Sequence, residues 1–115
     1  MECYESTKGE GSLVYQPLST GITYQLIPKL SADNIPILSS GYGRTSGRNG
    51  KIFKWVFNFP GTYWDAASVA TNHAMDMSDG SLEGKKIALV YHNSAYGNEP
   101  IRTVEVLSEK HGFEL

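Results

Sequence analysis

Two observations on the sequence predict an α/β fold with a parallel sheet. Short apolar segments alternate along the chain with segments whose apolar residues recur at helical spacing. The apolar segment 87–91 has too little alternation for a half-exposed strand, so we expect it to be buried on both faces, as in a parallel sheet. The resulting order of strand, helix, strand, loop, strand, helix, strand and helix is typical of α/β proteins with parallel strands.

The first half of the chain contains one predicted helix between two predicted strands. The strands are residues 13–16 and 35–38, and Pro36 favours an edge position for the second because proline has no N–H to donate. The stretch "PLSTG" offers a helix N-cap, and the apolar residues after it recur at helical spacing. Pro28 interrupts that pattern, so we expect a kink or an early end there.

A glycine-rich loop leads to the third predicted strand, "FKWVFNF". Apolar and polar residues alternate in this strand, so its aromatic side chains share one face. That face needs a cover, because an open aromatic face and open strand edges favour association with other chains. The residues of this face are Phe53, Trp55, Phe57 and Phe59.

A helix over residues 63–77 carries small apolar residues along one side and ends near Gly80. The strand 87–91 follows, and after the last helix residues 113–115 begin another strand. Since the chain stops where that strand starts, we expect it to be a piece of a longer α/β protein.

The last helix has the clearest boundaries. Asn98 or Glu99 is its expected cap, and Pro100 suits its first turn because the missing N–H would have no partner there. Gly112 lies where a helix tends to stop. The expected inner stripe consists of Ile101, Val104 and Leu107.

Length, charge and cysteine content narrow the functional classes. A chain of 115 residues is long enough for one ordinary domain with a modest core. A net charge of −2 argues against nucleic acid as a partner. Cys3 is the single cysteine and cannot form an intrachain disulfide. No apolar run approaches the roughly 18 residues of a membrane span, and the first residues lack the pattern of a signal peptide, so no membrane insertion is expected.

The glycine-rich loop "GYGRTSGRNGK" does not fit the known nucleotide-binding patterns. A phosphate loop would need glycine where Thr45 stands and a hydroxyl where Ile52 stands. A dinucleotide fingerprint would need its third glycine at Ser46. We therefore expect no nucleotide cofactor and interpret the loop as a plain or ligand-lining one.

The sequence does not support a metal site either. His73, Asp76 and Asp79 are spaced three apart and could share a helix face, but a metal site needs more ligands than these. We interpret them as a solvated helix face and expect neither a metal nor another cofactor.

The two candidate catalytic serines each lack part of the motif that a hydrolase site needs. Ser94 lies close in sequence to His92, but no third group that would orient the histidine is evident. A nucleophile elbow at Ser19 would need a glycine where Pro17 stands. A hydrolase or amidase that uses Ser94 and His92, or Ser19, remains the weaker alternative, and we assign no catalytic residue.

Three predicted strands end in loops of similar composition: "PLSTG", "SSGYG" and "HNSAYG". In open α/β sheets ligands bind at the carboxyl ends of the strands, where such loops converge. Hydroxyls, free backbone N–H groups and helix N-termini suit a small anion such as a carboxylate. These loops therefore predict the binding of a small polar molecule more than its chemical transformation.

Three segments, in order, carry a resemblance to a known family: "PLSTGITY…IPILSSGYGRTS", "FKWVFNFP" and "KKIALVYHNSAYGNEPIRTVEVLSEKHGFEL". Over nearly its whole length the chain resembles an internal piece of the type I periplasmic substrate-binding proteins of ABC transporters, in the branched-chain amino acid (Leu/Ile/Val-binding) group. The resemblance implies Rossmann-like, parallel-sheet pieces of two lobes. Residues 1–58 would belong to the first lobe and residues 59–115 to the first part of the second, with the hinge crossover near 58–60.

The resemblance also implies a ligand site. In this family, loops of the first lobe hold the ligand's carboxylate, and a tyrosine before a glycine closes over it from the second lobe. The expected ligand-binding residues are Ser19, Thr20, Ser40, Gly41, Tyr42, Gly43, Ser94 and Tyr96. Amino-acid binders usually carry a threonine where Gly43 stands, so one carboxylate contact is missing. The expected ligands therefore include amides, urea-like compounds and aromatic acids besides amino acids.

The function implied is that of a periplasmic solute receptor that captures a small molecule and delivers it to an ABC transporter permease in the membrane. It is not expected to be an enzyme. The main alternative is the ligand-sensing domain of a receptor or regulator, because the same two-lobe fold serves in both.

Overall fold

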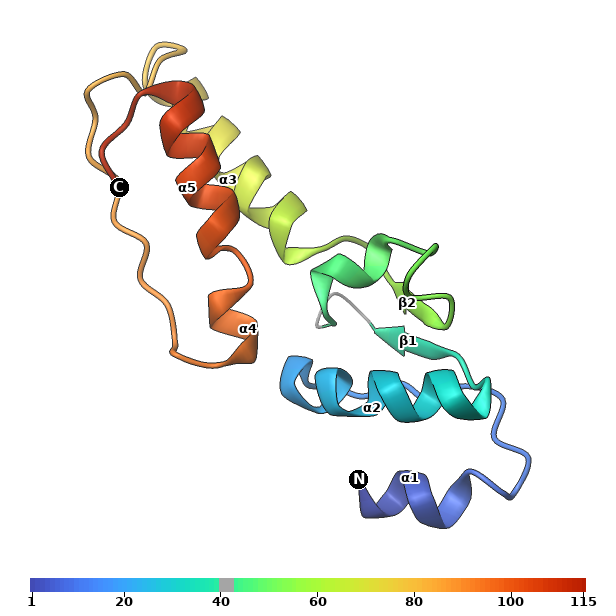
Figure 1. Cartoon of the computed structure of the whole chain (residues 1–115). Coiled ribbons are helices and arrows are strands. Elements are labelled where there is room, and N and C mark those ends of the chain that lie inside the picture. The colour runs from blue at the N-terminus through green and yellow to red at the C-terminus, as the bar shows by residue number, and fades with distance from the viewer. Residues whose placement is uncertain (40–42) are drawn as a thin grey trace. The chain divides into compact units, whose positions relative to one another are not determined.

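The computed structural model describes residues 1–39 and 43–115. These residues divide into two compact units, Met1–Thr62 and Tyr63–Leu115, each with its own hydrophobic core. The elements of the first unit are helices α1 (Glu2–Thr7) and α2 (Thr20–Asp33), strands β1 (Ile37–Ser39) and β2 (Val56–Asn58), and the short 3-10 helix η1 (Thr45–Arg48) (Figure 1). The elements of the second unit are helices α3 (Tyr63–Asp76), α4 (Ala95–Asn98) and α5 (Ile101–His111).

The sheet of the first unit is parallel, which confirms the predicted α/β class. Strands β1 and β2 pair with Ile37 opposite Val56. On the other side of β1, Tyr15 forms a parallel bridge to Ile37, and its N–H donates to the Pro36 carbonyl at 3.0 Å. The strand predicted at 13–16 is thus reduced to one bridge.

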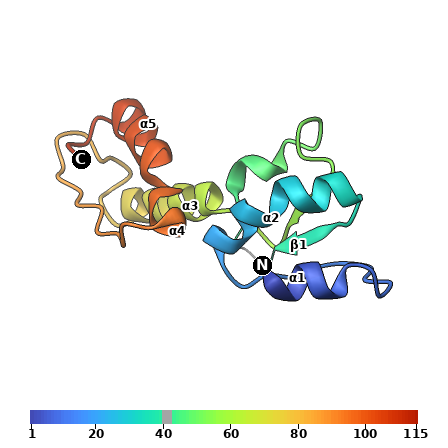
Figure 2. The same cartoon turned by 60° about the horizontal axis from the view of Figure 1, so that its bottom comes forward.

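Helix α2 supplies most of the core of the first unit. The cap predicted within "PLSTG" is present, and the residue that provides it is Ser19, which accepts a hydrogen bond from the Ile22 N–H at 3.3 Å. The buried face of α2 packs against the inner face of the sheet, and Figure 2 shows α2 alongside β1. The buried residues of this core are Tyr4, Leu26, Ile27, Leu30, Ile37 and Val56.

The expected early end of this helix at Pro28 is wrong. Helix α2 continues to Asp33 and stops at Asn34, whose φ of 56° is left-handed. A proline inside a helix costs about 3 kcal/mol. Ile27 and Leu30 lie on either side of it and are 7% and 0% exposed. Burying two such side chains contributes roughly 3–6 kcal/mol, enough to offset the proline.

The aromatic face predicted for the third strand is covered only in part, because Phe53 packs against the core of the first unit while two other aromatic side chains of this face stay exposed. Only Val56–Asn58 form a strand, and Val56 is the residue that turns to the core, at 6% exposure. Phe57 and Phe59 are 52% and 65% exposed. Because side chains alternate along a strand, α2 can cover only one face of this sheet, and it covers the face with Ile37 and Val56.

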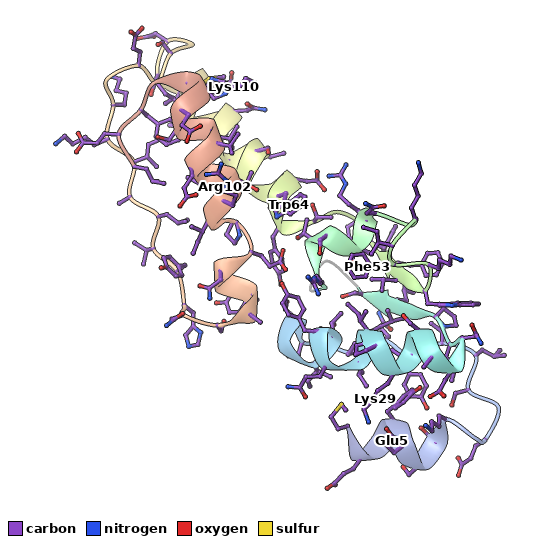
Figure 3. All side chains as sticks on the ribbon, in the orientation of Figure 1. Glu5, Lys29, Phe53, Trp64, Arg102 and Lys110 are labelled. Carbon is purple, nitrogen blue, oxygen red and sulfur yellow. The ribbon has the colours of Figure 1, made fainter. Side chains whose placement is uncertain are left out.

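Helices α1 and α2 are joined by an ionic network. The Lys29 ammonium pairs with Glu5, and Figure 3 shows these two side chains between α1 and α2. The Lys8 ammonium lies 3.2 Å from Asp33, which also accepts a hydrogen bond from the Tyr4 hydroxyl. This network fixes the short helix α1 on the outside of α2.

The second unit is built on the packing of α3 against α5, which lie side by side in Figures 1 and 2. Gly112 ends α5 with a φ of 70°, as predicted. The predicted cap at Asn98 or Glu99 is wrong. Asn98 is the last residue of α4, and Pro100 takes the cap position of α5 without a side-chain hydrogen bond.

The prediction that residues 87–91 form a strand buried on both faces is also wrong for the described structure. One parallel bridge joins Lys86 to Glu114, and the Ile87 N–H donates to the Glu114 carbonyl at 2.9 Å. Val90 is 92% exposed. Within the described residues no further segment pairs with this one, and an extended segment becomes a strand only when a neighbour completes its hydrogen bonds.

Candidate functional site

The start of α2 presents the first candidate residues. Ser19 is half-buried, and a hydroxyl that accepts a hydrogen bond from the Ile22 N–H still has its own proton to donate. Thr20 is only 3% exposed. Of the two residues expected to bind the ligand, Ser19 is therefore the one whose hydroxyl can reach a small molecule.

Gly43 lies in a confined position at the carboxyl end of the sheet. A Cβ added there would lie 2.5 Å from Asn58 Oδ1 and 2.6 Å from Ser39 Oγ. Ser39 and Asn58 are partners in the register of β1 and β2, so both side chains reach this point from neighbouring strands. Glycine is required here because the space for a side chain is already filled.

Asn58 also holds the chain that follows Gly43. Its Nδ2 donates to the Arg44 carbonyl at 2.9 Å. Its Oδ1 and the Ser39 hydroxyl are buried without a hydrogen-bond partner among the described residues. Sequence reasoning missed Ser39 and Asn58. These two residues lie opposite each other at the carboxyl ends of β1 and β2, and this pairing follows from the strand register, which the sequence does not show.

Arg44 connects this position to α2. Its guanidinium lies 5.2 Å from the ring centroid of Tyr24 and 5.2 Å from that of Phe53, both within cation–π range. Tyr24 is one turn after Thr20 on α2. The cation–π contact therefore brings the start of α2 close to the residue that follows Gly43. The other three expected residues of this loop, Ser40, Gly41 and Tyr42, lie outside the described residues.

The loop before α4 presents the remaining two candidates. Ser94 caps α4 by accepting a hydrogen bond from the Gly97 N–H at 3.5 Å. Gly97 is buried, and a Cβ there would lie 1.9 Å from the His92 carbonyl oxygen. The resulting tight fold of residues 92–97 leaves the Tyr96 side chain 50% exposed.

Two further aromatic rings lie next to the Tyr96 ring. The His92 ring is nearly parallel to it, at 10°, with centroids 6.1 Å apart. The Tyr63 ring, from the start of α3, is tilted by 43° with a centroid distance of 6.3 Å. These rings line a cavity of about 430 Å³ together with Leu89 and Tyr91. No pattern in the sequence assigned Tyr63 a role in a site.

A second cavity of about 370 Å³ lies next to the first in the same unit, between α3, α5 and residues 87–89, and shares Tyr63, Leu89 and Pro100 with it. It is lined mainly by alanine, isoleucine, leucine and valine side chains. The hydroxyl of Thr71, which also lines it, already donates to the Ala67 carbonyl at 2.9 Å. With so few polar groups to orient a ligand, this cavity, whose lining includes the exposed Ala66, Ala70 and Ala88, is not assigned as a ligand site.

The described residues give little support to a catalytic site or a metal site. The Ser94 hydroxyl caps α4 and the His92 ring stacks on Tyr96, with no hydrogen bond between these two side chains among the described residues. Within residues 1–39 and 43–115, no group of three or more metal-ligating side chains gathers in one place. None of the described helices combines the length and the apolar character needed to cross a membrane.

Comparison with known proteins agrees with this architecture. A family model described as periplasmic binding protein matches residues 7–115. Among solved structures, the chain is similar to the crystal structure of an ABC transporter permease from the Pseudomonas fluorescens group, with 39% identity and a TM-score of 0.87. The match covers 98% of this chain and 29% of that one, so the chain spans less than a third of that protein.

No curated protein sequence matches the chain. The family model nevertheless extends over both compact units and includes every candidate residue discussed above. The chain therefore belongs to the periplasmic binding protein family.

Proposed function

We propose that the chain contributes to a periplasmic solute receptor that captures a small polar ligand and delivers it to an ABC transporter permease. The ligand is an amino acid, an amide or a related carboxylate, held in a cleft between two lobes. Residues 1–58 belong to the first lobe and residues 59–115 to the first part of the second, with the hinge crossover near 58–60. Family membership supports the binding of a small solute, and the similar solved structure, described as an ABC transporter permease, supports a link to ABC transport.

The observation that carries the proposal is the half-buried Ser19 hydroxyl at the start of the 14-residue helix α2. A helix N-terminus has unpaired N–H groups and a partial positive charge, both of which favour a carboxylate or an amide oxygen. Affinity in the micromolar range corresponds to about 8 kcal/mol, which several charge-assisted hydrogen bonds in a closed cleft can supply.

Gly43 supports a ligand other than a typical branched-chain amino acid. The position at which the related amino-acid binders carry a threonine cannot hold one here, because its Cβ would lie 2.5 Å from Asn58 Oδ1. One hydroxyl contact to the carboxylate is therefore missing. Ligands that rely less on that contact, such as amides and aromatic acids, fit this arrangement as well as amino acids do.

The proposal is tested by binding measurements on the 115-residue chain with a panel of amino acids, amides and small carboxylates, using calorimetry. Ser19→Asp is the decisive variant, because aspartate still caps the helix but repels an anionic ligand. We expect it to lose carboxylate binding at least tenfold while its unfolding free energy changes little. Ser19→Thr keeps both the cap and the hydroxyl, and should bind within about threefold of the parent chain.

Two results would refute the proposal: the absence of binding for every compound in the panel, and equal carboxylate affinity in Ser19→Asp and the parent chain. The ligand-sensing alternative predicts the same binding and differs in its context. A DNA-binding segment or a membrane anchor in the same reading frame would favour a sensor, and a neighbouring permease gene would favour a transporter.

A further inference from the structure

We propose that the cavity lined by Tyr63, His92 and Tyr96 binds an aromatic ring, so that the ligand of this protein is a small aromatic carboxylate. The inference rests on the proposed function and narrows it to one class of ligand. It also adds Tyr63 and His92 to the expected site as residues that determine specificity.

The size and lining of the cavity are the first argument. Its volume of about 430 Å³ lies within the roughly 300–1,000 Å³ of small-molecule sites. Four of its lining residues carry aromatic rings, and they come from the start of α3, from the end of segment 87–92 and from α4. Both ring pairs have centroid distances in the range of about 4.5–7 Å that aromatic contacts prefer. A ligand ring can extend this cluster through the half-exposed face of Tyr96.

The rings are held in place before any ligand arrives. Gly97 packs against the His92 backbone and so fixes the start of α4, on which Tyr96 lies. Trp64 Nε1 donates to the Glu99 carbonyl at 3.2 Å, which ties the first turn of α3, and with it Tyr63, to the turn between α4 and α5. Binding to such a preformed surface costs little conformational entropy.

Charge favours an aromatic acid over a cation. The rings could also hold a quaternary ammonium group through cation–π contacts. However, none of the described residues that line the cavity is an aspartate or glutamate, whereas tyrosine hydroxyls and an imidazole are present. These groups can donate hydrogen bonds to a phenol or carboxylate oxygen.

The experiment compares the binding of three probes to the 115-residue chain: benzoate, cyclohexanecarboxylate and tetramethylammonium. Binding is measured by calorimetry and by NMR of the tyrosine ring protons. Benzoate and cyclohexanecarboxylate share a charge and a six-membered carbon ring, and only benzoate is aromatic. We expect benzoate to bind at least tenfold more tightly than either of the others and to shift the ring signals of Tyr63 and Tyr96.

Matched variants separate the ring from its hydroxyl. Tyr63→Phe should keep benzoate affinity within about threefold, and Tyr63→Leu should lose at least tenfold. If Tyr63→Leu unfolds, as judged by circular dichroism, the pair Tyr96→Phe and Tyr96→Leu makes the same comparison at a half-exposed position.

The outcomes distinguish the two proposals. If cyclohexanecarboxylate or an aliphatic amino acid binds as tightly as benzoate, the receptor function stands and the aromatic specificity is refuted. Tighter binding of tetramethylammonium, or equal benzoate affinity in the Phe and Leu variants, refutes it as well. If no carboxylate or amide binds at all, the proposed function itself fails and this inference fails with it.

Discussion

The backbone of Gly97 lies against the backbone of His92 so closely that a Cβ at position 97 would be 1.9 Å from the His92 carbonyl oxygen. The same carbonyl accepts a hydrogen bond from the Ser94 N–H at 2.8 Å. Neither group can move away without breaking the turn before α4. The contact therefore sets the direction in which Tyr96 leaves the backbone.

Gly97→Ala should consequently destabilise the second unit. Overfilling a packed site costs about 1–3 kcal/mol, and here the obstacle is backbone rather than a flexible side chain. Urea unfolding of the chain measures this loss, and the NMR ring signals of Tyr96 report the displacement of α4. Gly50→Ala is the control, because nothing lies within 4 Å of its added Cβ, and it should stay within about 0.5 kcal/mol of the parent. An unchanged Tyr96 spectrum and stability in Gly97→Ala would contradict the prediction.

Asn58 should stabilise the chain around Gly43. Asn58→Ala removes the hydrogen bond from Nδ2 to the Arg44 carbonyl, and we expect a loss of about 1–2 kcal/mol in the unfolding free energy. Asn58→Asp keeps the shape but replaces the donor by an acceptor, so it should cost at least as much. Asn72→Ala, at an exposed position of α3, is the matched control and should not lower the stability. Equal stability of all three variants would show that the bond to Arg44 contributes nothing.

The contact between Tyr4 and Asp33 predicts an acid-dependent stability. The hydrogen bond from the Tyr4 hydroxyl, with that from Lys8, lowers the pKa of Asp33 below its usual 3.8. A carboxyl group with a lowered pKa contributes stability above 3.8, and this contribution is lost as the pH falls through the folded-state pKa. We expect the difference in unfolding free energy between the parent chain and Tyr4→Phe to shrink on acidification. A difference that stays constant from neutral pH to about pH 2 would contradict this.

The same pair predicts a loss of stability at high pH. Burial and, second, the hydrogen bond to Asp33 raise the pKa of Tyr4 from 10.0 to about 12. A group with a raised pKa contributes stability that is complete below 10.0 and is lost as the pH rises through about 12. Phenolate absorbance should show one tyrosine that titrates late, and Tyr4→Phe should remove that late step. If Tyr4→Phe removed only absorbance that appears near pH 10 and left the late step in place, the assignment would be refuted.

The open face of the sheet should make the chain associate. Phe57 and Phe59 are more than half exposed next to the outer edge of β2, which pairs with no other strand among the described residues. Phe57→Thr combined with Phe59→Thr keeps β propensity and should lower association, as measured by sedimentation over a range of concentrations. Val69→Thr changes one exposed apolar residue on α3 and should leave association unaltered. A parent chain that stays monomeric at all concentrations would contradict the prediction.

The features that the sequence predicted correctly are local ones. The cap of α2 within "PLSTG" requires only a hydroxyl close to the first N–H groups of the helix. The end of α5 at Gly112 requires only a residue that accepts a positive φ. The buried side of α2 also followed from helical spacing. Such interactions involve neighbours in the chain, so a single sequence contains the information for them.

The features that it predicted incorrectly depend on partners distant in the chain. Pro28 did not end α2, because packing of its neighbours on the sheet outweighs the local penalty. Residues 87–91 have the composition of a buried strand, but within the described residues only Glu114 offers them a bridge. An aromatic face likewise becomes buried only if another element covers it, and composition does not supply that element.

The candidate site likewise combines local features, which the sequence shows, with contacts between distant residues, which it does not show. By itself, the sequence determined that Ser19 and Ser94 lie in loops that lead into helices and, by resemblance, which family the chain belongs to. Only the tertiary structure decided that Asn58 and Ser39 fill the space beside Gly43 and that Tyr63 joins His92 and Tyr96 around one cavity. These relations depend on strand register and helix packing, which bring together residues far apart in the chain, and no local pattern records such distances.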